Sequence, residues 1–374
     1  MTSSLTDLAS TNPALTDLGW SPFFADQFAD HLAAIAAADA IDGADSGSPA
    51  TSGLPLTPFR IIEVHRAQLT GFGASGANIL TTPHETTGSF AVGDWVLADT
   101  LDQVQVRLTR TTELNRRAAG NDARIQLIAA NVDTIYITTS CNADFNPARL
   151  ERYLALAQGA NCTPVVLMTK ADLSDSPADF AKQAAALAPD LIVMTVNTHD
   201  ADDLARIAAH CPLGKTAVLV GSSGVGKTTL MNGLTGSTEL TQGIREDDAK
   251  GRHTTTARTL RRMHSGGCLI DTPGIRSLRL LETDDGIDTV FADLHEISTQ
   301  CRFFDCGHNS EPGCAIRAAL KEGTIDADRL QRWTKLQLDE SRNNETLAQS
   351  RSRSKGSSKM IKTTQRAAKH RKAR

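Results

Sequence analysis

The chain has 374 residues, of which 40% are hydrophobic and 22% are charged. This composition is typical of a folded protein of two or three domains, and it excludes collagen, a wholly disordered chain and a small disulfide-stapled protein. No apolar run approaches the roughly 20 residues that span a bilayer, and the N-terminus lacks the basic start of a secretory signal. We therefore expect a cytoplasmic protein without a membrane partner, whose seven cysteines are reduced or bind metal.

Charge is distributed unevenly along the chain, although the formal net charge is only −4. Residues 1–58 contain seven aspartates and no lysine or arginine, and we expect an acidic, partly disordered extension with one alanine-rich helix over 26–41. Residues 351–374 contain ten lysines and arginines and no acidic residue. We predict a basic, disordered tail over 346–374 whose charges suit the phosphates of rRNA; the alternative is a solvated tail without a partner.

Between these ends the sequence changes character. Residues 59–115 hold short runs rich in β-branched residues that are separated by glycines, a pattern typical of a small β-barrel or sandwich. Residues 120–282 alternate strand-like and helix-like segments, which favours an α/β fold with a largely parallel sheet. Residues 283–345 are predicted to be helical pieces around a cysteine and histidine cluster. The expected fold is therefore multidomain.

A phosphate-binding loop is predicted at residues 221–228, where GSSGVGKT fits G-x-x-x-x-G-K-[ST] at every fixed position. The motif follows an apolar strand over 216–220 and precedes a helix-like segment, which is the context that it requires. We expect Lys227 to reach the β- and γ-phosphates as a catalytic group and Thr228 to bind Mg²⁺. The expected nucleotide-binding residues of this loop are Gly221, Ser222, Ser223, Gly224, Val225, Gly226, Lys227, Thr228 and Thr229.

A second phosphate-side motif, DTPG, occupies residues 271–274 at the end of a predicted strand. An acid at the end of a neighbouring strand is where the magnesium-side carboxylate of a P-loop nucleotidase belongs. We therefore expect Asp271 to act on Mg²⁺ and the backbone N–H of Gly274 to approach the γ-phosphate.

The base-binding motif is predicted upstream of the phosphate loop. Thr169, Lys170, Ala171 and Asp172 follow a predicted strand over 164–168 and resemble N-K-x-D, the guanine motif of GTPases, with threonine in place of asparagine. A carboxylate at Asp172 can accept hydrogen bonds from guanine N1–H and the exocyclic amine, whereas adenine offers neither in that arrangement. The expected nucleotide is therefore GTP.

The order of the two motifs predicts an altered chain topology. In ordinary GTPases the phosphate loop comes first, but here Asp172 precedes Gly221 by 49 residues. The same sheet can still form if the domain is circularly permuted, because domain termini commonly lie close together. By topology alone, residues 197–199 are then expected to form the second guanine-side loop.

A metal site is predicted at Cys301, Cys306, His308 and Cys314, which supply three thiolates and one imidazole within 14 residues. Four protein ligands of this kind suit one tetrahedral, structural zinc ion and leave no position for water. The alternative is a set of buried free cysteines beside a surface histidine.

Hydrolysis is expected to be slow without a partner. Many GTPases place a glutamine after the acidic motif to orient the attacking water, but Ile275 stands there and cannot form a hydrogen bond. Residues 251–256 (GRHTTT) are expected to form the switch segment, with Thr254 or Thr255 on Mg²⁺ and the γ-phosphate. His253 is the candidate to position water, and a solvent-facing histidine is the alternative.

Taken together, these motifs resemble one family, the circularly permuted, ribosome small-subunit-dependent GTPase A. The resemblance covers about residues 15–345 and rests on LGW, AANVD, RYLALA, TKADL, GSSGVGKTTL, GRHTTT, DTPG and the C-x4-C-x-H-x5-C cluster. It implies an N-terminal OB-fold, a central permuted GTPase domain and a C-terminal zinc domain. It also implies a role in late assembly of the small (30S) ribosomal subunit and its rRNA.

The resulting hypothesis is a monomeric enzyme that binds the small subunit, hydrolyses GTP to GDP with Mg²⁺, and is stimulated by the subunit. Two alternatives stay open at this point. One is an RNA-binding assembly factor whose nucleotide site is a slow structural switch. The other is an ATP-using P-loop protein, against which the carboxylate of Asp172 argues.

Overall fold

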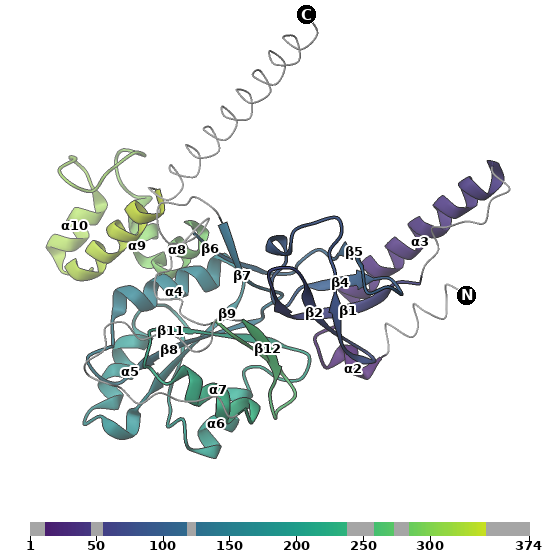
Figure 1. The fold of residues 1–374 in the computed structure, drawn as a ribbon. Coiled ribbons are helices and arrows are strands. Elements are labelled where there is room, and N and C mark those ends of the chain that lie inside the picture. Colours follow the sequence, from purple (N-terminus) through teal and green to yellow (C-terminus); the bar gives the residue numbers. More distant parts are fainter. Residues whose placement is uncertain (1–11, 46–54, 118–124, 238–257, 273–283, 342–374) are drawn as a thin grey trace, which may run out of the picture.

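The computed structural model describes residues 12–45, 55–117, 125–237, 258–272 and 284–341. Figure 1 shows an α/β domain with a smaller β-domain on one side and a group of helices on the other. Among the described residues, no helix combines the length and the apolar character that crossing a bilayer demands.

The central α/β domain is built on a sheet whose strands run in the order β10-β9-β8-β11-β13-β12. Each strand pairs in parallel with the next from β10 to β13, and β12 then pairs antiparallel with β13. The strands are β8 (Thr134–Ser140), β9 (Thr163–Thr169), β10 (Ile192–Thr195), β11 (Thr216–Gly221), β12 (Thr259–Arg262) and β13 (Cys268–Asp271). The largely parallel sheet expected from the sequence is therefore present.

Helices cover both faces of this sheet because successive side chains of a strand point to opposite sides. Ile135 and Ile137 share one buried cluster with the helices α4 (Pro147–Gly159) and α5 (Pro177–Ala185). Tyr136, between them in β8, belongs to a second cluster on the other face, formed with α6 (Ala201–Ala208) and α7 (Lys227–Thr235). The strand carrying the predicted phosphate loop, β11, thus lies in the middle of a sheet buried on both sides.

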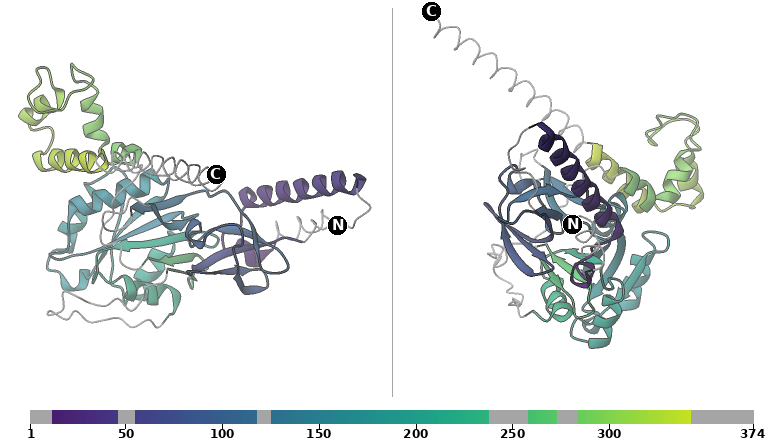
Figure 2. Two further views of the ribbon diagram at one scale, coloured as in Figure 1. Left: turned by 45° about the horizontal axis from the view of Figure 1, so that its top comes forward. Right: turned by 90° about the vertical axis from the view of Figure 1, so that its right-hand side faces the viewer.

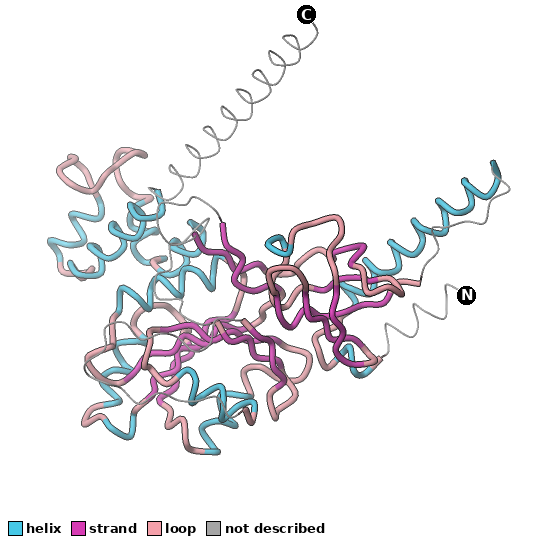
Figure 3. Tube along the Cα trace, in the orientation of Figure 1, coloured by secondary structure: helices cyan, strands magenta, loops and turns pink. Residues whose placement is uncertain are grey.

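The N-terminal β-domain carries strands β1 to β5, which pair only antiparallel with one another. They are β1 (Thr57–Val64), β2 (Leu69–Gly73), β3 (Gly76–Leu80), β4 (Trp95–Ala98) and β5 (Val104–Arg107), with a 3-10 turn, η1 (Thr87–Ser89), before β4. The domain has its own buried cluster, and Figure 3 shows its strands running on from those of the α/β domain. The link is an antiparallel contact between β1 and β12, in which Glu63 lies opposite Thr259.

A separate two-stranded ribbon connects these two domains. Strands β6 (Glu113–Arg117) and β7 (Ile125–Ala130) pair antiparallel and lead directly into β8. Asn131, in the turn after β7, has a positive φ of 55° and accepts the backbone N–H of Thr111 on its side-chain oxygen at 2.8 Å. Its own amide donates to the carbonyl oxygen of Gly93 at 2.9 Å, which ties the ribbon to the β-domain.

The N-terminal segment packs against the β-domain through aromatic side chains. A short helix, α2 (Pro13–Thr16), precedes α3 (Pro22–Asp45), which begins four residues before the expected start at 26. Proline is well suited to a first helical position. Buried side chains anchor the segment, among them Trp20, whose ring lies 4.7 Å from that of Trp95. The rest of α3 extends beyond the β-domain (Figure 2).

The C-terminal helical domain comprises α8 (Asp284–Val290), α9 (Ala292–Ser298), α10 (Ala315–Glu322) and a helix over 327–341. It packs on α4 of the α/β domain. The backbones approach closely at Gly286, where an added Cβ would lie 2.1 Å from the carbonyl oxygen of Ala155. Nearby, the buried carboxylate of Glu151 accepts two hydrogen bonds from Arg332, at 2.8 and 3.0 Å.

Candidate functional site

The predicted phosphate loop connects the central strand β11 to helix α7. Gly221 ends the strand with φ of +143°, and a Cβ there would lie 2.1 Å from the carbonyl oxygen of Thr138 on β8. Gly226 adopts a left-handed φ of +92° and caps the start of α7. The backbone N–H groups at this helix start face the loop, which is the arrangement that binds phosphate.

Lys227 lies over the loop that precedes it. Its Nζ donates to the carbonyl oxygen of Gly221 at 2.9 Å and to that of Ser222. The ammonium group is thus held where the loop's phosphate-binding concavity is expected. Thr228 and Thr229 follow on the first turn of α7, both half-buried, whereas Ser223 and Gly224 are exposed at the tip of the loop.

The base-binding motif is joined directly to this loop. Thr169 ends β9 and is 1% exposed, and its hydroxyl lies 2.7 Å from the carbonyl oxygen of Val225 in the loop. The same hydroxyl lies 3.0 Å from the carbonyl oxygen of Thr139 on β8. One side chain therefore connects segments that are 56 residues apart in the chain.

The rest of the motif turns outward at the carboxyl end of β9. Lys170 has a left-handed φ of 57°, which starts the single turn η2 (Ala171–Leu173). Asp172 is exposed on this turn, so its carboxylate is available to a ligand. Because β9 and β11 are parallel and separated only by β8, the base motif and the phosphate loop lie at the same edge of the sheet.

The acidic motif reaches the same edge from the other side of β11. Asp271 ends β13 opposite Leu219 of β11, and the hydroxyl of Thr272 donates to the carbonyl oxygen of Leu219 at 2.6 Å. Asp271 also lies opposite Thr259 of β12. Several predicted site residues lie outside the described residues, namely His253, Thr254, Thr255, Gly274 and Ile275.

Residues 197–199 follow β10, the strand beyond β9, as the topology required. The backbone N–H of Val196 donates to the carbonyl oxygen of Met168 at 2.9 Å. Asn197 then turns the chain, donating its N–H to the carboxylate of Asp203 and accepting the N–H of His199. The loop thus leaves the sheet at the edge that holds the base motif.

Sequence reasoning missed one side chain that reaches the phosphate loop. Tyr153 lies on α4 and is 3% exposed. Burial raises the pKa of its phenol to about 12, while a hydrogen bond from the backbone of Gly221 acts in the opposite direction. A buried tyrosine hydroxyl needs a partner, but only the packing of α4 on the sheet identifies that partner as the loop.

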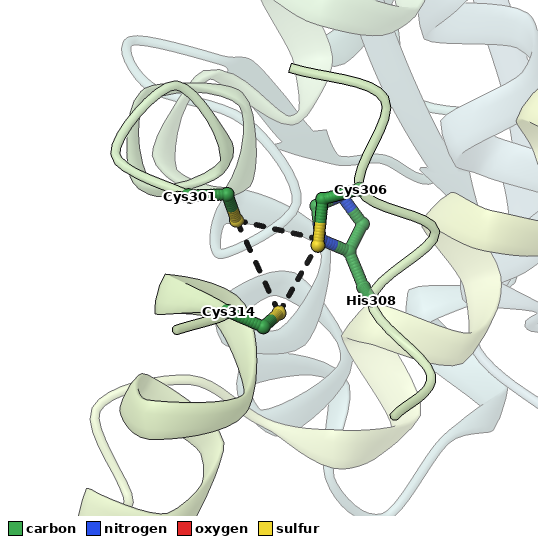
Figure 4. A group of neighbouring side chains, drawn as sticks. All are labelled: Cys301, Cys306, His308 and Cys314. Carbon is green, nitrogen blue, oxygen red and sulfur yellow. Dashed lines mark hydrogen bonds between the residues drawn. The ribbon is translucent and has the colours of Figure 1, made fainter. Parts of the chain in front are cut away.

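The cysteine and histidine cluster forms as predicted, between α9 and α10 (Figure 4). The ligand atoms of Cys301, Cys306, His308 and Cys314 all lie within 4.8 Å of one another. Nδ1 of His308 is 3.6 Å from the sulfur of Cys301 and 3.5 Å from that of Cys314, and these two sulfurs are 4.0 Å apart. A zinc tetrahedron requires about 3.6 Å between sulfur and nitrogen and about 3.8 Å between sulfurs, so the residues fit the ion.

The surroundings of Cys301 and His308 favour their metal-binding protonation states, whereas at Cys306 a backbone hydrogen bond at His308 is outweighed by burial and the neighbouring sulfurs, which raise the pKa of this thiol to about 11. Burial opposes ionisation of Cys301, but the backbone N–H groups of Ala315 and Ile316 at the start of α10 bring its pKa below the usual value. Burial lowers the pKa of His308, which favours the neutral, ligating imidazole. The ring of His308 stacks on Trp333, with centroids 5.7 Å apart, and this fixes its orientation.

Comparison with known proteins agrees with this geometry. The RsgA GTPase family model matches residues 107–281, and an ABC transporter model matches residues 204–362, a range that also contains the phosphate loop. A protein of Mesorhizobium japonicum named "Small ribosomal subunit biogenesis GTPase RsgA" is 49% identical, over 90% of this chain and 92% of its own length. "Small ribosomal subunit biogenesis GTPase RsgA 2" of Vibrio parahaemolyticus is 39% identical, over 95% of this chain and 94% of its own.

Two solved structures have the same fold. YjeQ from Thermotoga maritima matches with a TM-score of 0.54 and 19% identity, over 75% of this chain and 97% of its own. YloQ, described as a circularly permuted GTPase, matches with a TM-score of 0.53 and 24% identity, over 77% of this chain and 96% of its own. The permuted motif order, the fold and the extent of sequence identity agree, and the chain belongs to the RsgA GTPase family.

Proposed function

We propose that this protein is a GTP hydrolase that binds the small ribosomal subunit, assists its late maturation, and is stimulated by the subunit. The observation that carries the proposal is the hydrogen bond from Thr169 to Val225, which joins a guanine-type motif to a phosphate loop at one edge of the sheet. The relatives named as small ribosomal subunit biogenesis GTPases support the choice of partner.

In this proposal the guanine base lies between η2 and residues 197–199, with Asp172 accepting its N1–H and exocyclic amine. The phosphates lie on the loop from Gly221 to Thr229, and Lys227 moves from its carbonyl partners to the β- and γ-phosphates. Mg²⁺ bound with GTP would be held by Thr228 and Asp271, together with Thr254 or Thr255, and would neutralise charge on the phosphates.

The hydrolytic step depends on how one water is placed. Since Ile275 cannot form a hydrogen bond to it, we propose that His253 orients the water and that Gly274 contacts the γ-phosphate. The bound subunit would order the segment 251–256 and so raise the rate. Loss of the γ-phosphate would release that segment and favour release of the subunit.

The flanking domains would bind the subunit. We propose an OB-fold over 59–115, a permuted GTPase domain over 120–282 and a zinc-binding helical domain over 283–345, with one structural zinc on the four-residue cluster. The basic tail over 346–374 would contact rRNA phosphates, and the acidic extension would occupy 1–58. We expect a monomer that acts in the cytoplasm, where small subunits are assembled.

The deciding experiment measures turnover of GTP and ATP with and without purified small subunits. We expect slow hydrolysis of GTP alone, strong stimulation by subunits, and little hydrolysis of ATP. Lack of stimulation would reject the small subunit as the partner. Equal hydrolysis of ATP would reject the assignment of a guanine-selective site. If Lys227→Ala still matured subunits at the normal rate, GTP hydrolysis would not be needed for maturation, and the nucleotide site would be a structural switch.

A change of base specificity tests the role of Asp172 directly. Asp172→Asn exchanges two acceptors for one acceptor and one donor, which matches the carbonyl that xanthine has where guanine has its amine. We expect weaker GTP binding and a new ability to bind xanthosine triphosphate, measured by competition with a fluorescent nucleotide. Unchanged preference for GTP in this variant would place the base elsewhere.

A further inference from the structure

Among the described residues, Arg60 is the arginine or lysine that the fold buries most completely, and it lies at the junction between the β-domain and the α/β domain. Arg60, on β1, is 1% exposed. Nη2 of its guanidinium donates to the carbonyl oxygen of Asn131 at 3.1 Å and to the hydroxyl of Thr216 at 3.2 Å. These acceptors belong to the interdomain turn and to the first residue of β11, so one side chain of the β-domain holds the base of the phosphate-loop strand.

The charge of Arg60 has no direct carboxylate partner among the described residues. Its Nε has no hydrogen bond, and its Cζ lies 5.4 Å from the ring centroid of Trp95. Asp94, an acid of the β-domain, accepts hydrogen bonds from Nε and Nη2 of Arg110 instead, at 2.7 and 2.8 Å. Burial lowers the pKa of Arg60, and longer-range attraction from the carboxylates of Asp133 and Asp94 opposes this. A buried cation with so little compensation is costly, so stability alone does not account for it.

The backbone around Arg60 is shaped to admit the guanidinium. Gly93 and Gly19 both have positive φ, and a Cβ on either would lie within 3.4 Å of a terminal nitrogen of Arg60. A Cβ on Gly93 would also lie 2.1 Å from the carbonyl oxygen of Ala130. The N-terminal segment, the β-domain, the interdomain turn and the α/β domain therefore meet at this one group.

Two sets of contacts connect β1, the strand that carries Arg60, to the nucleotide site. Thr216 is fixed to Asp133 by hydrogen bonds of 2.9 and 2.8 Å and begins the strand that ends at Gly221. Three residues after Arg60 on the same strand, Glu63 lies opposite Thr259 of β12, and Thr259 lies opposite Asp271 of β13. Any rotation of β1 thus acts on the first residue of β11, Thr216, and on β12, the strand that pairs with β13 beside Asp271.

We propose that Arg60 is a positioning residue that couples binding of the small subunit by the β-domain to the rate of GTP hydrolysis. This inference rests on the proposed function. Because the guanidinium is held by neutral acceptors instead of a carboxylate, a change in the angle between the domains exchanges or lengthens these bonds without separating an ion pair. The subunit, by fixing that angle, would fix β11 and β12, and hence the phosphate loop and the end of β13 at Asp271.

The test compares basal and subunit-stimulated GTP turnover in matched variants. Arg60→Met keeps the packing on Trp95 and removes the hydrogen bonds, and Thr216→Val removes one acceptor with little change of shape. For both we expect basal turnover within about twofold of the wild type, unchanged affinity for the subunit, and stimulation reduced by about tenfold or more. Arg60→Lys, which keeps a charge and a donor, should recover part of the stimulation.

Two controls separate coupling from simple stability. Arg110→Met removes a cation whose hydrogen bonds to described residues go to Ser89, Asp94 and Glu113, all outside the α/β domain, so it should lower thermal stability while leaving the stimulation ratio intact. The double variant Arg60→Met with Thr216→Val should be no worse than Arg60→Met alone, since both remove one interaction.

The possible failures are distinguishable. Normal stimulation in Arg60→Met and Thr216→Val, or an equal fall in basal and stimulated turnover, would overturn the assignment of Arg60 and leave the proposed function standing. The same loss of stimulation in Arg110→Met would also overturn it. A wild-type protein that subunits do not stimulate would instead reject the proposed function and the coupling together. If Arg60→Met does not fold, Thr216→Val alone decides.

Discussion

Thr169 stands where the guanine motif of GTPases has asparagine, and a single hydroxyl there still joins two strands to the phosphate loop. A threonine has one hydroxyl where asparagine has a carboxamide, so the contact at this position must differ from that of the usual motif. In the structure the hydroxyl lies 2.7 Å from the carbonyl oxygen of Val225 and 3.0 Å from that of Thr139. Because a hydroxyl has only one proton, it serves these acceptors alternately or in a shared bond.

We expect Thr169→Val to weaken GTP binding about tenfold, because the loop carbonyl loses a buried donor worth about 1 kcal/mol or more. The matched control is Thr139→Val on the adjacent strand. The hydroxyl of Thr139 is buried without a hydrogen bond, so its removal should leave affinity within about twofold of the wild type. Titration with a fluorescent GTP analogue measures both. Equal affinities in the two variants would show that Thr169 does not organise the loop.

At the scale of elements, the start of α3 shows how one helix can anchor a segment. Phe23 and Phe24 are neighbours in sequence, but Phe23 is 43% exposed and Phe24 is 3% exposed beside Trp20 and Trp95. Phe24→Ala should lower the free energy of unfolding by about 3–4 kcal/mol because it opens a cavity between aromatic rings. Phe23→Ala should cost less than about 1 kcal/mol. Denaturant titration decides, and similar losses would contradict the packing of α3.

The contact of α4 with the helix over 327–341 offers a second comparison. Glu151 is 1% exposed and bonded to Arg332, whereas Arg152, its neighbour, forms a half-exposed pair with Asp339 at 2.8 Å. Glu151→Gln should cost about 2–4 kcal/mol, since it removes the buried counter-ion of the partly exposed Arg332 guanidinium. Arg152→Met should cost at most about 1 kcal/mol. Urea titration of each variant measures the difference, and a large loss in Arg152→Met alone would reverse the assignment.

Local signals in the sequence predicted much of this architecture and little of what joins its parts. The strand before the phosphate loop, the acid that ends β13 and the cysteine spacing are each readable within a few residues. Thr216 and Arg60, by contrast, are 156 residues apart, and Glu151 and Arg332 are 181 apart. No local pattern pairs such residues, because their meeting depends on how whole domains pack. The role of Tyr153 at Gly221 was hidden for the same reason.

At the scale of the whole molecule, the seven cysteines divide into two chemically different groups. Cys141, Cys162, Cys211 and Cys268 are buried in the domain cores, and burial raises the pKa of Cys162 and Cys211 to about 12. At pH 8 such thiols are almost wholly protonated and unreactive. The other three belong to the proposed zinc cluster, where the metal would protect them.

We therefore expect a thiol reagent at pH 8 to modify none of the cysteines in the zinc-loaded protein, three after a strong chelator removes the metal, and all seven in denaturant. Release of one zinc ion per chain, followed with a zinc dye, should accompany the first step. Three reactive thiols before any chelator is added would show that the cluster does not retain a metal.

The two segments that we propose to contact the γ-phosphate each lead toward a different flanking domain. Downstream of residues 251–256 the chain enters β12, which borders the β-domain, and downstream of Asp271 it continues toward α8, the first helix of the C-terminal domain. In a conventional order both stretches would be internal to one domain. Here the chain after Asp271 leads into the C-terminal domain, and the strand after residues 251–256 borders the β-domain. Loss of one γ-phosphate therefore has a short route to both flanking domains, and a domain held by a large particle has the same route back to the nucleotide.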